Sequence, residues 1–263
     1  MSIADINNAA TAMNQLKARY EGFLDGADDQ IAARQAAYDG LAGNLINVVN
    51  GQMYFTVTVD PDEPNPAVNQ DGGTFTTIKA AIEAAPMGSA VLVYLKAGKT
   101  HQIASTVFVK NRDIVVVKSG AGDNPVIAPA AGSNGASNYL SCLRFDPGAT
   151  LRMVDVDIQF PPKIEEALPW NSDKALIGYH PGATTVLELV RSVVTGTGGL
   201  ALTSAATGVR VGLTLNTVTL DGDITAVTSA NFGVSLIGKH AVTLLNGAAI
   251  TDGGTVGVNI LQN

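Results

Sequence analysis

Cysteine is nearly absent from this chain of 263 residues, which contains only Cys142. No disulfide can form within the chain, and the apolar neighbours of Cys142 predict a buried, inert thiol. Charged residues are also scarce, at 15%, and the net charge is −7. Because nucleic acids and anionic lipid surfaces attract basic faces, this charge argues against a nucleic-acid partner and against a polybasic membrane patch.

Long apolar runs are absent as well, and none approaches the length of a membrane span. The first ten residues, MSIADINNAA, lack the basic and apolar regions of a secretion signal. We therefore expect that the chain does not insert into a membrane. We also expect that the protein is assembled in the cytoplasm. Aromatic residues make up only 5% of the chain, whereas there are 28 glycines. Together with frequent Ala, Val and Thr, this composition is typical of stacked, β-rich repeats.

Residues 1–52 contain no proline and are rich in Ala, Asn and Gln. Their larger apolar residues recur at alternating steps of three and four, which is typical of the a and d positions of a coiled coil. This predicted oligomerisation row contains Ile6, Met13, Leu16, Tyr20 and Phe23, and then Ile31, Tyr38, Leu41, Leu45 and Val48. The two series are offset by four residues around Gly26, which indicates a stutter or a loop and favours a break between two helices.

This helical stalk has two interpretations. Its apolar row packs against copies of the same chain, or it packs on its own chain as an ordinary helical subdomain. Residues 53–69 follow as a connector, in which 53–59 alternate like a strand and Pro61, Pro64 and Pro66 impose extended geometry. We place the domain boundary in this connector.

Residues 71–97 read as a glycine turn, a short amphipathic helix over 74–85, a Pro/Gly break and a buried strand over 91–95. The helix has the length and pattern expected of a cap that covers the open end of a stacked β structure. The run GTFTTIKAAIEAAP at 73–86, followed by VLVYLKAG at 91–98, resembles the entry of the pectin-lyase-like superfamily. Within this superfamily the segment is most similar in sequence to pectin methylesterases. A similar N-terminal segment occurs in β-helical tail fibres and tailspikes of bacteriophages.

This resemblance implies a mainly β fold, a right-handed parallel β-helix over 70–263. It implies little about function, because the superfamily hosts both enzymes and inert binding shafts. The methylesterase motifs are missing: Lys99, Thr100, His101 and Gln102 stand where a Tyr and Glu pair is expected. Neither the Gln-Ala segment nor the Asp-Phe-x-Phe-Gly segment is present. We therefore predict no catalytic residues of this type.

A turn motif repeats farther along the chain. The segments 145–150 and 179–184 share the order aromatic, polar, Pro, Gly, Ala, Thr, and their glycines are 34 positions apart. This spacing predicts repeats of roughly 25 to 35 residues. The alternation of apolar and polar residues slips at Val154 and near Asn216, which predicts corners of the fold in the left-handed backbone region.

Candidate acids for glycan cleavage are few. Asp155 and Asp157 are expected to point the same way on one strand, about 7 Å apart at Cα, within the range of paired catalytic carboxylates. The alternative is plain solvated charge. The remaining candidate acids are Glu165, Glu166, Glu188, Asp221, Asp223 and Asp252. His101, His180 and His240 show no metal-ligand spacing and are expected in solvated turns, so we predict neither a metal nor a cofactor.

The longest irregular segment, 161–171, contains the only Trp. We predict a receptor-binding surface there, formed by Trp170, Glu165, Glu166 and Asn171, since an exposed indole can stack on a sugar ring. The alternative is that Trp170 packs this loop onto the β structure.

These features favour a homotrimeric phage tail fibre, a virion protein assembled in the host cytoplasm. Its helices would hold a baseplate or other virion proteins, and its β structure would face a host surface glycan or protein. The number three comes from the resemblance. The alternatives are a tailspike-type depolymerase or pectin-active enzyme, and an architectural spacer that carries another receptor-binding chain.

Overall fold

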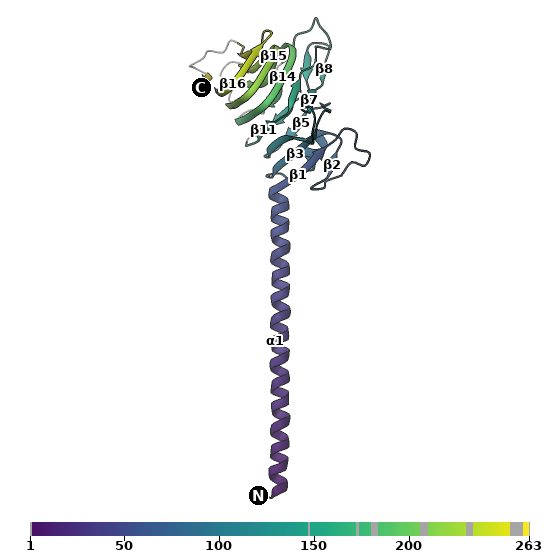
Figure 1. Ribbon diagram of the computed structural model, residues 1–263, viewed down its shortest axis with the longest axis vertical. Helices are drawn as coiled ribbons and strands as arrows, with labels where there is room; N and C mark the ends of the chain where they lie inside the picture. The colour runs from purple at the N-terminus through teal and green to yellow at the C-terminus, as the bar shows by residue number, and fades with distance from the viewer. Residues whose placement is uncertain are drawn as a thin grey trace. The chain divides into compact units, whose positions relative to one another are not determined.

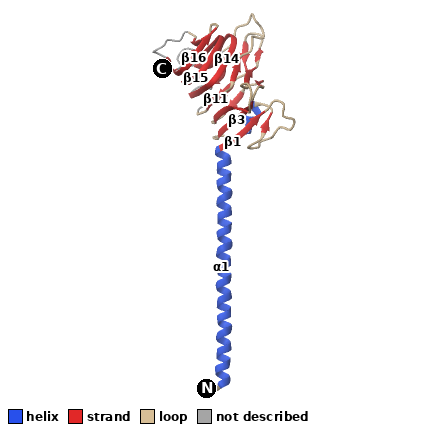
Figure 2. Cartoon of the chain, viewed as in Figure 1, coloured by secondary structure: helices blue, strands red, loops and turns tan. Residues whose placement is uncertain are grey.

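The structure is a computed structural model that describes residues 2–146, 148–171, 174–179, 184–205, 210–229, 234–252 and 260–262. Figures 1 and 2 show a chain that is mainly β, with one long helix at its N-terminal end. It forms two compact units, Met1–Asn50 and Gly51–Asn263. No helix among the described residues is both long and apolar enough to cross a membrane.

Helix α1 runs without interruption from Ile3 to Met53, over 51 residues. The predicted break near Gly26 is therefore wrong. A glycine inside a helix costs only about 1 kcal/mol relative to Ala, and extending an existing helix adds one hydrogen bond for each residue. The four-residue offset in the apolar row is a stutter, which changes the phase of the row without ending the helix.

Strand β1 (Tyr54–Val59) pairs in parallel with the short strand β2 (Thr74–Phe75). Helix α2 covers Ile78–Ala84, so the predicted helix over 74–85 began too early. The reason is local: Thr77 has an extended backbone and its hydroxyl accepts a hydrogen bond from the Ala80 amide at 3.1 Å, which makes it the N-cap. Ile78 and Ile82 of α2 are buried in the core.

The remaining strands come from short segments along the whole second unit. They are β3 (Ala90–Lys96), β4 (Thr100–Ile103), β5 (Val107–Val109), β6 (Asp113–Ser119), β7 (Val126–Pro129), β8 (Ala131–Ser133), β9 (Asn138–Leu140), β10 (Leu143–Phe145), β11 (Thr150–Val154), β12 (Asp157–Gln159), β13 (Ala175–Tyr179), β14 (Thr184–Ala205), β15 (Arg210–Ser229), β16 (Val234–Leu245), β17 (Ala249–Thr251) and β18 (Ile260–Gln262). Within the described residues, 16 strands join in one parallel sheet, and β8 and β9 form a separate antiparallel pair.

The parallel pairs arrange these strands in three ladders. The first ladder contains β1, β3, β6, β11 and the beginnings of β14, β15 and β16. The second contains β4, β7, β12 and the middle parts of β14 and β15, followed by the end of β16. The third contains β5, β10, β13, the ends of β14 and β15, and β17. The chain visits the ladders in this order and then returns to the first.

One such pass takes between 23 residues, from Ala90 to its partner Asp113, and 37 residues, from Asp113 to its partner Thr150. This range is slightly wider than the 25 to 35 predicted. The first residues of the two copies of the repeated turn motif, Phe145 and Tyr179, are register partners. Residues 180–183 of its second copy, with His180, lie outside the described residues.

The core consists of stacked aliphatic rows. In β3, Val91, Val93 and Leu95 are buried, while the residues between them are only partly covered. Val91 lies beside Ile114 on the next pass, and Ile114 lies beside Leu151. Because side chains alternate along a strand, every second residue adds one layer to this core. The Cys142 side chain is buried, as predicted.

Four residues with a left-handed backbone lie at the corner between the first and second ladders. They are Asp155, Arg191, Thr217 and Ala241, with φ of 56°, 52°, 57° and 51°. Each directly follows a residue of one register row, Val154, Val190, Asn216 and His240. The corners predicted at Val154 and near Asn216 are therefore confirmed, although the residues there are not Gly or Asn.

Candidate functional site

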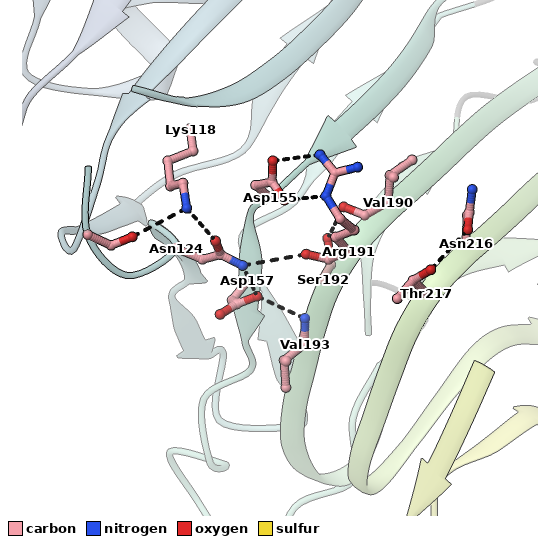
Figure 3. Close-up of polar contacts among 11 residues, drawn as sticks. Lys118, Asn124, Asp155, Asp157, Val190, Arg191, Ser192, Val193, Asn216 and Thr217 are labelled. Atoms are coloured by element: carbon pink, nitrogen blue, oxygen red, sulfur yellow. Dashed lines mark hydrogen bonds and ion pairs between the residues drawn. The ribbon is translucent and has the colours of Figure 1, made fainter. Parts of the chain in front are cut away.

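The predicted acid pair lies at this corner. β11 ends at Val154 and β12 begins at Asp157, so the expectation that Asp155 and Asp157 share one strand is wrong. The left-handed Asp155 turns the chain between them. Figure 3 shows that each carboxylate has its own set of partners.

Asp155 is held by Arg191 of the next pass. The guanidinium Nε and Nη2 of Arg191 each donate to a different oxygen of Asp155 at 2.7 Å. The amide of Asp155 also donates to the Val190 carbonyl at 3.0 Å. The Arg191 hydrogen bonds lower the pKa of Asp155, because they favour its ionised form.

Asp157 is held by two other groups. One of its oxygens, Oδ1, accepts from the Val193 amide at 2.8 Å and from the Asn124 side chain at 3.1 Å. Lys118 in turn donates to the Asn124 carbonyl oxygen at 3.2 Å, as Figure 3 shows. These contacts connect successive passes of the chain. The lowered pKa of Asp155 makes that carboxylate a poor general acid. Asp155 and Asp157 therefore both link successive passes of the chain at this corner.

Most other candidate acids also have partners. Glu188 pairs with Arg152 at 3.1 Å, and Asp221 accepts from Asn246 at 2.7 Å. Glu165 accepts a hydrogen bond from the Ser133 hydroxyl. Asp223 and Asp252 are exposed. Within the described residues, no group of three His, Cys, Asp or Glu side chains could hold a metal ion.

The segment 161–171 is organised by Asn138, a residue that the sequence did not single out. The Asn138 side chain is fully buried. Its amide nitrogen donates to the carbonyls of Glu165 and Leu168 at 2.8 and 3.0 Å, and its oxygen accepts from the amides of Ile164 and Glu165. Asn138 was missed because a single polar residue in a sequence does not reveal distant backbone partners.

The predicted receptor-binding residues of this segment differ in their exposure. Trp170 is partly buried and packs against the hydrophobic core. Glu165 and Glu166 are exposed, and the amide of Asn171 donates to the Asn138 carbonyl at 2.8 Å. Trp170 therefore anchors this segment, and the exposed part of the predicted surface is its acidic side.

The predicted oligomerisation row is exposed along α1. Leu16, Phe23 and Leu41 expose 68%, 71% and 69% of their surface in the single chain. The other members of the row are also exposed, namely Ile6, Met13, Tyr20, Ile31, Tyr38 and Leu45. The Val48 side chain lies outside the described residues. This row forms an extended apolar surface that is exposed to solvent in the single chain.

A further exposed surface runs across the second ladder. Its outward row contains Gln102, Ala128, Gln159, Thr195 and Asp221. Gln102 pairs with Ala128, and Gln159 pairs with Thr195, which pairs with Asp221. Between these two groups, β7 and β12 pair at Ile127 and Ile158, one position before Ala128 and Gln159. Two hollows of about 410 and 320 Å³ lie along this row and share Gln159, Phe160 and Pro162. We call these two hollows together the Gln159 groove. Nothing in the sequence alone could have shown that residues from five strands meet there.

No protein-family model, no curated protein and no solved structure matches this chain.

Proposed function

We propose that this protein is a homotrimeric structural appendage of a virion, of the phage tail-fibre type. In this proposal α1 assembles the chains and contacts other virion proteins, and the β unit presents a host-facing surface. The observation that carries the proposal is the exposed apolar row of α1.

The energetics of this row favour self-association. Burying a Leu, Ile or Phe side chain contributes about 1.5 to 3 kcal/mol, and the row offers such side chains from Ile6 to Leu45. The steps of three and four keep these residues on one side of the helix, and a four-residue stutter is compatible with a continuous coiled coil. Copies of the same chain carry apolar side chains at the same spacing, and each copy can bury these side chains against those of the others.

The β unit supports the second part of the proposal. Three parallel ladders visited in a fixed order, with left-handed corners in register, are what a right-handed parallel β-helix requires. The first ladder also leaves apolar side chains outward, with Tyr54 and Leu236 exposed by 64% and 59%. Such a shaft is suited to adhesion, since weak single contacts are strengthened when several copies act together.

The first test is the solution mass of the full chain by light scattering, combined with binding to host-envelope polysaccharide and an assay for reducing ends. A trimer that binds without releasing sugar is the expected result. A monomer overturns the proposal, and release of oligosaccharides replaces it with the polysaccharide depolymerase. A trimer that binds no host surface component identifies an architectural spacer.

A further inference from the structure

The Gln159 groove has a composition that restricts its ligand. Its outward row offers the side chains of Gln102, Gln159, Thr195 and Asp221, and Asn246 lies beside Asp221. Amide and hydroxyl groups both donate and accept hydrogen bonds. Pro162, which is exposed and lines both hollows, adds an apolar surface.

The charge in the groove is limited to one sign. Among the described residues that line the two hollows there is no Lys, Arg or His, and Asp221 is the only ionisable side chain. An anionic ligand would find no cation there and would be repelled by Asp221. A largely apolar peptide would cover Gln159 and Asp221 without satisfying them, which costs free energy.

The groove is also elongated. Its strand residues come from β4, β7, β12, β14 and β15, which are consecutive strands of the second ladder. Asn246, which directly follows β16, the next strand of this ladder, also lines the groove. Neighbouring strands lie about 4.8 Å apart, so these six positions extend over about 24 Å. This length suits a chain of several units better than a single small molecule.

We propose that the Gln159 groove binds an uncharged oligosaccharide, whose units lie across the strands of the second ladder. Hydroxyl groups of the sugar pair with Gln159, Thr195 and the Asp221–Asn246 pair, and its carbon-bound hydrogens pack on Pro162. This inference rests on the proposed function, because it names the class of host receptor. It places the receptor site on the ladder and not on the acidic side of the 161–171 segment.

The test uses the full chain and an array of neutral hexasaccharides (α- and β-glucans, mannans, galactans and N-acetylglucosamine oligomers) beside uronic acid and sialylated oligosaccharides. Binding is then quantified by saturation-transfer NMR and calorimetry for the wild type, Gln159→Ala and the control Gln70→Ala. Both glutamines are exposed, but Gln70 lies outside the groove. We expect a neutral oligosaccharide to bind, with roughly tenfold weaker affinity for Gln159→Ala and unchanged affinity for Gln70→Ala.

Three results would overturn the inference: no neutral oligosaccharide binds at millimolar concentration, only acidic ones bind, or Gln159→Ala binds as well as the wild type. Circular dichroism of Gln159→Ala checks that a loss of binding is not a loss of folding. Light scattering on the same samples separates the two proposals. A trimer without sugar binding removes only the groove, whereas a monomer that binds sugar removes only the trimeric fibre.

Discussion

His101 shows how far the surroundings of one residue can depart from its sequence context. We expected a solvated turn, but His101 occupies an inward position of β4 and is only 2% exposed. Its Nε2 lies 3.2 Å from the Lys96 carbonyl oxygen, and its Nδ1 is buried without a partner among the described residues. The alternation along Thr100–Ile103 points His101 inward, because the strand must bury Ile103 on the same side.

This burial predicts a pH dependence of stability. Burial lowers the pKa of His101, although the hydrogen bond to the Lys96 carbonyl and the charge of Asp60 oppose this shift. Below about pH 6.5 the His101 side chain of the unfolded chain binds a proton that the folded chain does not. The contribution of His101 to the free energy of unfolding is therefore constant above that pH. It decreases as the pH falls from about 6.5 toward the lowered pKa of the folded state. The slope cannot exceed about 1.4 kcal/mol per pH unit.

Urea unfolding of the wild type and of His101→Leu between pH 7.5 and 5 measures this effect. We expect a shallower dependence in the variant, since leucine cannot titrate and still fills the position beside Ile127. Equal slopes would show that His101 is protonated equally in the folded and unfolded states. Carboxylates such as Asp155, whose pKa is lowered, lose their contribution only at more acidic pH.

Thr217 offers a second test at the residue scale. It has a φ of 57°, which is unfavourable for a β-branched residue, whereas asparagine tolerates it. Thr217→Asn should therefore increase the free energy of unfolding by about 0.5 to 1 kcal/mol. The control Thr219→Asn, two residues along the same strand β15, should decrease it, because asparagine is unfavourable in strands. Thermal unfolding of both variants compares them, and a destabilised Thr217→Asn would contradict the strain argument.

At the scale of elements, α1 carries the proposed assembly. Leu16→Glu places a carboxylate in the proposed seam of every copy, and burying these like charges together is unfavourable. We expect this variant to shift the light-scattering mass from the trimer toward the monomer at micromolar concentration. Ala18→Glu, which lies outside the row, should keep the wild-type mass.

The outcome for this pair distinguishes two roles of the helix. If Leu16→Glu keeps the wild-type mass, assembly depends on the β unit and not on α1. A loss of mass in both variants would mean that added charge anywhere on the helix disturbs it. Circular dichroism at the same concentration reports whether the helix itself persists. This check is needed because a helix obtains most of its stability from packing against other elements.

The elements also show where local rules fail. Gly26 suggested a helix end, but one glycine is a small cost within 51 helical residues. Thr74 was assigned to α2 by its position before an amphipathic run, yet it pairs with Thr58 in β1. For Thr74 the decisive interaction lies outside the local sequence window.

At the scale of the whole molecule, oligomeric state and ligand class are separate questions. In our proposals the α1 row assembles the trimer, and the Gln159 groove recognises the receptor. A trimer would carry three such grooves, so that a weak single site becomes effective on a surface that displays many copies of the ligand.

Local periodicity was sufficient to predict a helical N-terminal segment, although not that it forms one helix, and also a β-rich remainder and corners near Val154 and Asn216. These features arise from backbone geometry and from alternation within a few residues. Only the tertiary structure decided which residues share a site. Gln102, Gln159 and Asp221 come together through the register of separate strands, Asn138 binds backbone groups some 27 residues away, and Asp155 is committed to Arg191. Such contacts depend on the number of residues in each pass, and a shift of register by a single residue would turn every one of these side chains to the opposite face.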